Sequence, residues 1–172
     1  MKRIAFPLVV TLFLALATAS FAAELKFGYA DIQKIVFLSD AGKEAKDQMS
    51  IKGAALEAEK NAREDALKKL SVELERQGVL LNESARMAKE KDYKQKLKEY
   101  QRFKMDAQDE LKDKNDELTN RIAEDIVKIT QEYGRKNGYT FIFVKDNFMV
   151  FADDKVDLTD ELMKLFNASK KK

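Results

Sequence analysis

The chain has 172 residues, of which 32 are basic and 30 acidic. This length corresponds to about one ordinary domain. Cysteine and histidine are both absent, which excludes disulfides, thiol nucleophiles, imidazole bases and the commonest zinc ligands. Serines and carboxylates occur without an obvious catalytic constellation. We therefore expect neither an enzyme nor a bound cofactor.

Residues 1–22 have the three parts of a secretory signal peptide. Lys2 and Arg3 form a basic start, an apolar run covers residues 4–19, and small residues occupy the cleavage positions that end at Ala22. Cleavage is predicted after Ala22 or after Ala23, with export to the periplasm. An uncleaved membrane anchor is the alternative, although the apolar run is short for a span of about 20 residues.

Cleavage also changes the charge of the protein. Loss of the two basic residues of the leader leaves 30 basic and 30 acidic residues. A neutral mature chain lacks the basic excess that favours nucleic acid, so we expect no nucleic-acid partner. The single proline, Pro7, is lost with the leader, and a proline-free chain suits long helices.

Residues 23–38 are predicted to form the first part of a small body. The stretch 25–30 alternates between apolar and polar or small residues, which indicates a strand. Residues 31–38 are predicted to form a short helical turn.

Residues 39–137 are predicted to form a helical-hairpin arm. Composition rich in Ala, Leu, Lys and Glu predicts a first helix over 41–77 and a second over 85–137. Ser39 or Asp40 would cap the first helix, and Asn82 or Ser84 the second. The apolar residues of the second helix recur at the coiled-coil spacing from Tyr93 to Leu118, with lysines expected at two seam positions, Lys104 and Lys114.

Gly53 interrupts the first long helix. One interpretation is a tolerated helical glycine, which costs about 1 kcal/mol relative to alanine. The other is a hinge that lets the arm splay, because sharp helix bends often occur at glycine.

Residues 138–172 are predicted to form the second part of the body. Gly138 follows Asn137 as a helix stop. The period then changes to two over 140–144 and again over 149–152, with a tight turn between, which predicts a β-hairpin. A short helix is predicted after Asp157 or Thr159, up to about residue 167.

Aromatic residues divide the chain in the same way. Of the eight Phe residues after the leader, only Phe103 lies in the predicted arm. Large aromatics build cores, so the two ends should form one α+β body, mainly α with a small sheet. So small a sheet is marginal alone, and its exposed strand edges favour pairing between chains. The residues predicted for an oligomeric body are Leu25, Phe27, Tyr29, Phe141, Phe143, Val150 and Phe151.

The arm is polarised in charge. Segment 86–104 has eight basic and three acidic residues, whereas segment 106–125 has eight acidic and three basic residues. One interpretation is a solvated face with i,i+4 pairs. The other is a distal face that attracts acidic clients or anionic lipid. Its candidate binding residues are Arg86, Lys89, Lys91, Lys94, Lys96, Lys98, Arg102 and Lys104.

The order of these features resembles the Skp/OmpH family of periplasmic chaperones. The local cues are LKFGYADIQKIV after the leader, the glycine in IKGAALEAE, and the ending FMVFADDKVDLTDELMKLF. The resemblance implies a homotrimer with a β-barrel-like body and three arms around a cavity. It also implies an ATP-independent holdase for unfolded outer-membrane proteins, with weak contact to anionic lipid or lipopolysaccharide. A structural coiled-coil protein of the envelope is the alternative.

Overall fold

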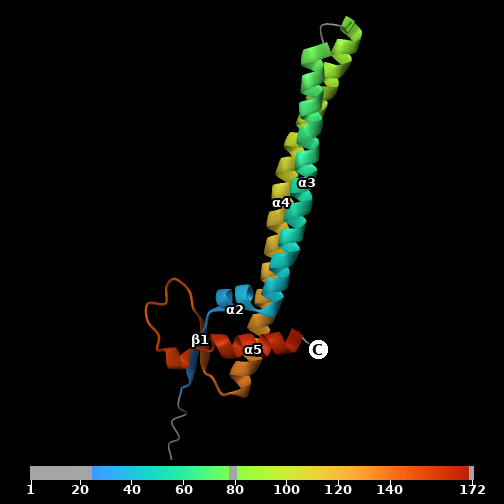
Figure 1. Ribbon diagram of the computed structural model, residues 1–172. Coiled ribbons are helices and arrows are strands. Elements are labelled where there is room, and N and C mark those ends of the chain that lie inside the picture. The colour runs from blue at the N-terminus through green and yellow to red at the C-terminus, as the bar shows by residue number, and fades with distance from the viewer. Residues whose placement is uncertain (1–24, 78–80, 171–172) are drawn as a thin grey trace, which may run out of the picture.

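The computed structural model describes residues 25–77 and 81–170. The predicted leader and its cleavage at Ala22 or Ala23 lie outside the described residues. Figure 1 shows two parts, a small body and a long two-helix arm that projects from it. The chain is mainly helical with one small sheet, as the sequence predicts.

Two short parallel strands form the sheet of the body. Strand β1 (Phe27–Ala30) pairs with β2 (Phe141–Val144), with Phe27 opposite Phe141 and Ala30 opposite Val144. Parallel strands need a long crossover connection. Here the entire arm is that connection, so the sheet joins chain segments that lie more than 110 residues apart in sequence.

The prediction of an antiparallel β-hairpin is wrong for the single chain. A turn follows β2, where the Asp146 carboxylate accepts a hydrogen bond from the Phe148 amide at 2.9 Å. Residues 149–152 then form no strand. The third contact of the sheet is instead an isolated parallel bridge between Tyr29 and Asp157. Alternation is typical of a strand, but a strand also needs a partner, and within the chain β1 already pairs with β2 and with Asp157.

The hydrophobic core lies where the arm joins the body. It is built from α2 (Ile32–Leu38), the last third of the second arm helix, and α5 (Thr159–Lys170). A short 3-10 helix, η1 (Asp154–Val156), precedes α5. The fully buried side chains include Ile35, Ile126, Leu162 and Phe166. Each such side chain contributes about 1.5–3 kcal/mol when it leaves water, so this junction holds the body on the arm.

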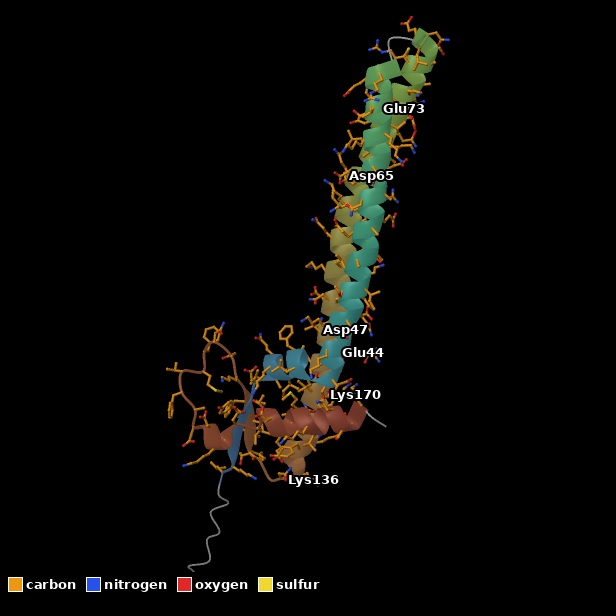
Figure 2. All side chains as sticks on the ribbon, viewed as in Figure 1. Glu44, Asp47, Asp65, Glu73, Lys136 and Lys170 are labelled. Atoms are coloured by element: carbon orange, nitrogen blue, oxygen red, sulfur yellow. The ribbon has the colours of Figure 1, made fainter. Side chains whose placement is uncertain are left out.

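The arm consists of α3 (Asp40–Gln77) and α4 (Glu83–Lys136). At 1.5 Å per residue these helices are about 57 Å and 81 Å long. Figure 2 places Glu44 and Asp47 near the root and Glu73 near the distal end. Among the described residues, no helix is both long and apolar enough to cross a membrane.

The helix boundaries follow the predicted signals. The Ser39 hydroxyl accepts a hydrogen bond from the Gly42 amide at 3.1 Å at the start of α3. The Asn82 side chain accepts one from the Ala85 amide at 2.9 Å at the start of α4. Gly138 has a φ of +69° just after α4, which confirms the predicted glycine stop.

The apolar seam of α4 is confirmed with one correction. Tyr93, Leu97 and Leu111 are half-buried against α3, as expected. The prediction of Lys104 on the seam is wrong, because Lys104 is exposed and Phe103 is half-buried in its place. The guanidinium of Arg63 on α3 lies 4.5 Å from the centre of the Phe103 ring. Phe103 therefore occupies the seam position that the heptad spacing predicts for Lys104.

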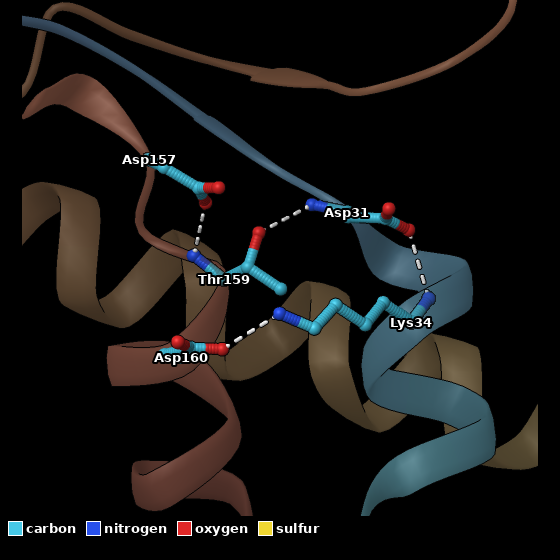
Figure 3. Close-up of polar contacts among 5 residues, drawn as sticks. All are labelled: Asp31, Lys34, Asp157, Thr159 and Asp160. Atoms are coloured by element: carbon cyan, nitrogen blue, oxygen red, sulfur yellow. Dashed lines mark hydrogen bonds and ion pairs between the residues drawn. The ribbon is translucent and has the colours of Figure 1, made fainter. Parts of the chain in front are cut away.

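A polar cluster ties the two ends of the body together (Figure 3). The buried Thr159 hydroxyl accepts a hydrogen bond from the Asp31 amide at 2.9 Å, and the Asp157 carboxylate accepts one from the Thr159 amide at 2.8 Å. Lys34 and Asp160 form an ion pair at 2.9 Å. The Asp31–Thr159 and Lys34–Asp160 contacts join residues that lie 128 and 126 positions apart in the sequence, so they fix α5 against β1 and α2.

Candidate functional site

Large apolar side chains are exposed on the two strands of the body and on the loop that follows β2. Rings on the two strands stack, with centroids of Phe27 and Phe141 6.0 Å apart and those of Phe141 and Phe143 5.9 Å apart. The loop after β2 adds Phe148, Val150 and Phe151, which are 88%, 98% and 87% exposed. Large apolar side chains exposed in this number commonly mark an interaction site. We call the set of Leu25, Phe27, Phe141, Phe143, Phe148, Val150 and Phe151 the apolar body surface.

Sequence reasoning selected six of these seven residues. It does not include Phe148, which lies in the predicted turn. A large apolar side chain at an exposed turn position is the signal that could have identified it. Sequence reasoning also included Tyr29, which is only 4% exposed. Burial and the nearby carboxylate of Asp157 raise the pKa of the Tyr29 hydroxyl. Tyr29 therefore supports the surface from inside its own chain.

Polar contacts fix the register of the two arm helices. Lys52 pairs with Glu110 at 2.5 Å near the middle of the arm. Further out, the Tyr100 hydroxyl donates a hydrogen bond to Glu64 at 3.0 Å. Burial and this hydrogen bond raise the pKa of the Tyr100 hydroxyl above its ordinary value. The resulting alignment places segment 57–75 beside segment 86–104.

The eight candidate basic residues divide into two groups of four. In the first group, Lys89 pairs across the arm with Glu73 at 2.8 Å, and Lys104 lies over the Tyr100 ring at 5.1 Å. Arg86 and Arg102 pair within α4 with acidic residues one turn away. These four side chains thus serve the structure of the arm.

The second group consists of Lys91, Lys94, Lys96 and Lys98. All four are exposed, and none forms an ion pair with another residue in the part of the chain that the structure describes. We call them the free distal lysines. They are the members of the predicted set whose charge is available to a partner.

Gly53 lies in an unbroken stretch of α3. A Cβ placed on it would meet nothing within 4 Å, so packing within the chain does not require glycine there. A shallow groove of about 270 Å³ runs past it, lined by Leu56, Phe103, Ala107 and Leu111 among others. The hinge at Gly53 stays a prediction, now with loose packing around it.

Comparison with known proteins agrees with this architecture. A crystal structure from Caulobacter crescentus, which carries the provisional description of an outer membrane chaperone (OmpH-like), superposes with a TM-score of 0.78 at 16% identity. The match covers 86% of each chain, and at this identity it shows a shared fold. No curated protein matches the sequence.

The family comparison covers nearly all of the described residues. The sequence matches the family described as "Outer membrane protein (OmpH-like)" over residues 26–166. This range includes both strands, the whole arm and most of α5. The chain is therefore a member of the OmpH-like (Skp/OmpH) family.

Proposed function

We propose that the protein is an ATP-independent holdase of the periplasm that binds unfolded outer-membrane proteins and prevents their aggregation. The observation that carries this proposal is the arm itself. Both of its helices project far beyond the core, and four exposed lysines near its distal end have no ion pair in the described structure. Family membership and the predicted signal peptide support the periplasmic location.

The apolar body surface is proposed to join three chains into a homotrimer. Among the described residues, the exposed rings and the outer edge of β2 leave apolar area and one strand edge without a partner. Pairing of the loop 145–152 with another chain would cover both. A trimer joined at its bodies would hold three arms around a shared space.

Client binding is assigned to the inner surfaces of these arms. Scattered apolar side chains on the arm, such as Met87 and Met105, are about two-thirds exposed. The free distal lysines add nonspecific attraction for acidic segments of a client. No single contact needs to be strong, because several arms act on one chain and raise the effective concentration.

The free distal lysines are also the place where an anionic lipid or lipopolysaccharide would bind. The neutral charge of the mature chain limits this attraction, because the acidic residues of segment 106–125 lie on the same arm. We therefore expect lipid contact to be weak and sensitive to salt.

The proposal is tested with an unfolded outer-membrane barrel protein diluted out of urea. Light scattering is measured with and without the mature protein, and native mass spectrometry gives the stoichiometry. We expect scattering to be suppressed at one trimer per client. Normal aggregation of the client at that ratio would contradict holdase activity.

Substitution of exposed rings tests whether the apolar body surface holds the trimer together, without changing the arm. Phe148→Ser with Phe151→Ser is expected to lower the mass to that of a monomer while the helix content stays constant. Leu165→Ser, at a partly exposed position on α5, is the matched control and should keep the oligomer.

The alternative function is a structural coiled-coil spacer. It predicts no client complex and a narrow rod in solution. Small-angle scattering distinguishes such a rod from a hollow assembly with splayed arms.

A further inference from the structure

One exposed strip of α4 carries opposite charges at its two ends. At 3.6 residues per turn, eight of its residues lie within about 100° of one another around the helix. All eight are exposed. In chain order they are Lys91, Lys94, Lys98, Arg102, Met105, Asp109, Asp113 and Asp116.

The charges of this strip are largely unused inside the chain. Lys94, Lys98, Asp109 and Asp113 have no ion pair with any residue within the described ranges 25–77 and 81–170. Asp116 pairs loosely with Lys112 at 3.7 Å. Lys112 is the one residue of the wrong sign on this face. An open groove of about 760 Å³ runs along the side of α4, and its acidic lining residues are Asp106, Asp109, Glu110, Asp113 and Glu117.

The order of the charges is self-complementary in an antiparallel alignment. When a second α4 runs in the opposite direction and is centred between residues 103 and 104, Lys94 lies opposite Asp113 of the second copy, and Lys98 lies opposite Asp109. In the same register Lys91 faces Asp116, Arg102 faces Met105, and Lys112 faces the uncharged Gln95. Two-fold symmetry repeats every contact. A parallel alignment in register would place like charges together.

We propose that the arms of this protein pair with arms of a second copy, antiparallel, through the α4 strip from Lys91 to Asp116. The exposed Met105 lies near the two-fold axis and supplies apolar contact there. The charge pairs on either side set direction and register more than affinity. Each exposed pair is weak and screened by salt, so the association depends on several arms acting together.

The test measures mass by sedimentation at low and high salt, about 20 mM and 500 mM, where screening differs strongly. Wild-type protein is expected to double its mass at low salt relative to high salt at concentrations up to about 100 µM. Lys94→Glu with Lys98→Glu should stay at the high-salt mass, and so should Asp109→Lys with Asp113→Lys. A wild-type mass that is equal at both salt concentrations overturns the proposal.

A mixture of the two double variants gives the sharpest result. Each variant repels itself but is complementary to the other, so a 1:1 mixture should double its mass again. The quadruple variant, which carries all four changes in one chain, should also double. Failure of both to recover the low-salt assembly contradicts the register.

The matched control lies on the other arm helix. Lys68→Glu with Lys69→Glu makes the same change in charge at a similar height on α3, at exposed positions. This control variant should still double its mass at low salt. Loss of the doubling would mean that net charge, and not the position of the charges on α4, controls the association. The sedimentation test contains no client, so its result does not depend on holdase activity. Asp109→Lys with Asp113→Lys leaves the free distal lysines unchanged, so an aggregation assay of that variant reports on the holdase proposal separately.

Discussion

The body and the arm are stabilised in different ways. All eight residues of the described core cluster lie in the body or at the arm root. Beyond the root, the arm contributes one buried apolar side chain among the described residues, Leu67. Its helices are otherwise held by half-buried seam residues and exposed polar pairs. The comparison shows that a small core can stabilise a long projecting hairpin when the root of each arm helix packs against that core.

The largest expected effect is in the core of the body. Phe166 of α5 is fully buried in the core at the arm root, whereas Leu165 next to it is 42% exposed. Phe166→Ala should lower the free energy of unfolding by about 3–5 kcal/mol, and Leu165→Ala by much less. Urea unfolding followed by circular dichroism measures both. Similar losses from the two variants would mean that the junction does not hold the structure.

Two glycines of the same helix should respond in opposite directions. A Cβ on Gly42 would lie 1.8 Å from the Val36 carbonyl oxygen, because α2 and α3 meet there. Gly42→Ala should therefore destabilise by about 1–3 kcal/mol through overpacking. Gly53→Ala should stabilise α3 by up to about 1 kcal/mol. Thermal unfolding of both variants is the measurement, and destabilisation by Gly53→Ala would contradict the open packing around Gly53.

The Gly53 variant also tests the hinge. If the arm bends there, Gly53→Ala should narrow the range of arm separations measured by spin labels near the distal end. An unchanged distribution of arm separations would contradict a hinge at Gly53.

The polar cluster of the body should give an intermediate effect. Thr159→Val keeps the shape of the side chain but removes the acceptor for the Asp31 amide. A buried donor left without a partner costs about 1–3 kcal/mol. Denaturant unfolding should show this loss. Thr140→Val, at an exposed position beside β1, is the control and should change stability little.

Acid should weaken the body through the same cluster. Burial raises the pKa of Asp157, but hydrogen bonds from Thr159 and Tyr29 outweigh it, and the pKa falls below its ordinary value of 3.8. A hydrogen bond from Lys170 likewise lowers the pKa of Asp125. A carboxyl with a lowered folded-state pKa stabilises above its unfolded pKa, and this stability is lost as pH falls through the folded pKa.

The expected loss therefore begins below about pH 4. Asp157→Asn should make stability less dependent on pH in this window, as measured by urea unfolding at several pH values. Asp65→Asn on the exposed arm is the control. An unchanged slope in Asp157→Asn would show that this carboxylate does not contribute.

The smallest effect is expected on the arm. Tyr100→Phe removes the hydrogen bond to Glu64 but keeps the ring on the seam. Exposed polar pairs contribute about 0.2–1 kcal/mol, so the unfolding midpoint should move only slightly. A loss as large as that of Phe166→Ala would place the main stability of the protein in the arm and break the comparison.

The helices of this protein were determined by local sequence. Asn82, Ser39 and Gly138 mark helix ends through hydrogen bonds or backbone angles that neighbouring residues supply. The spacing of Tyr93, Leu97 and Leu111 likewise defines a seam without reference to distant segments. Such signals are readable because capping and helical periodicity act over a few residues.

The tertiary structure decided the pairing of the strands and the use of the charges. Residues 149–152 alternate like a strand but have no strand partner among the described residues, where β2 pairs with β1 across the inserted arm. Lys89 and Lys94 look alike in sequence, yet Lys89 faces Glu73 across the seam and Lys94 faces outward. Strand pairing and ion pairing both depend on residues far apart in the chain, so only the folded arrangement separates structural groups from those left for a partner.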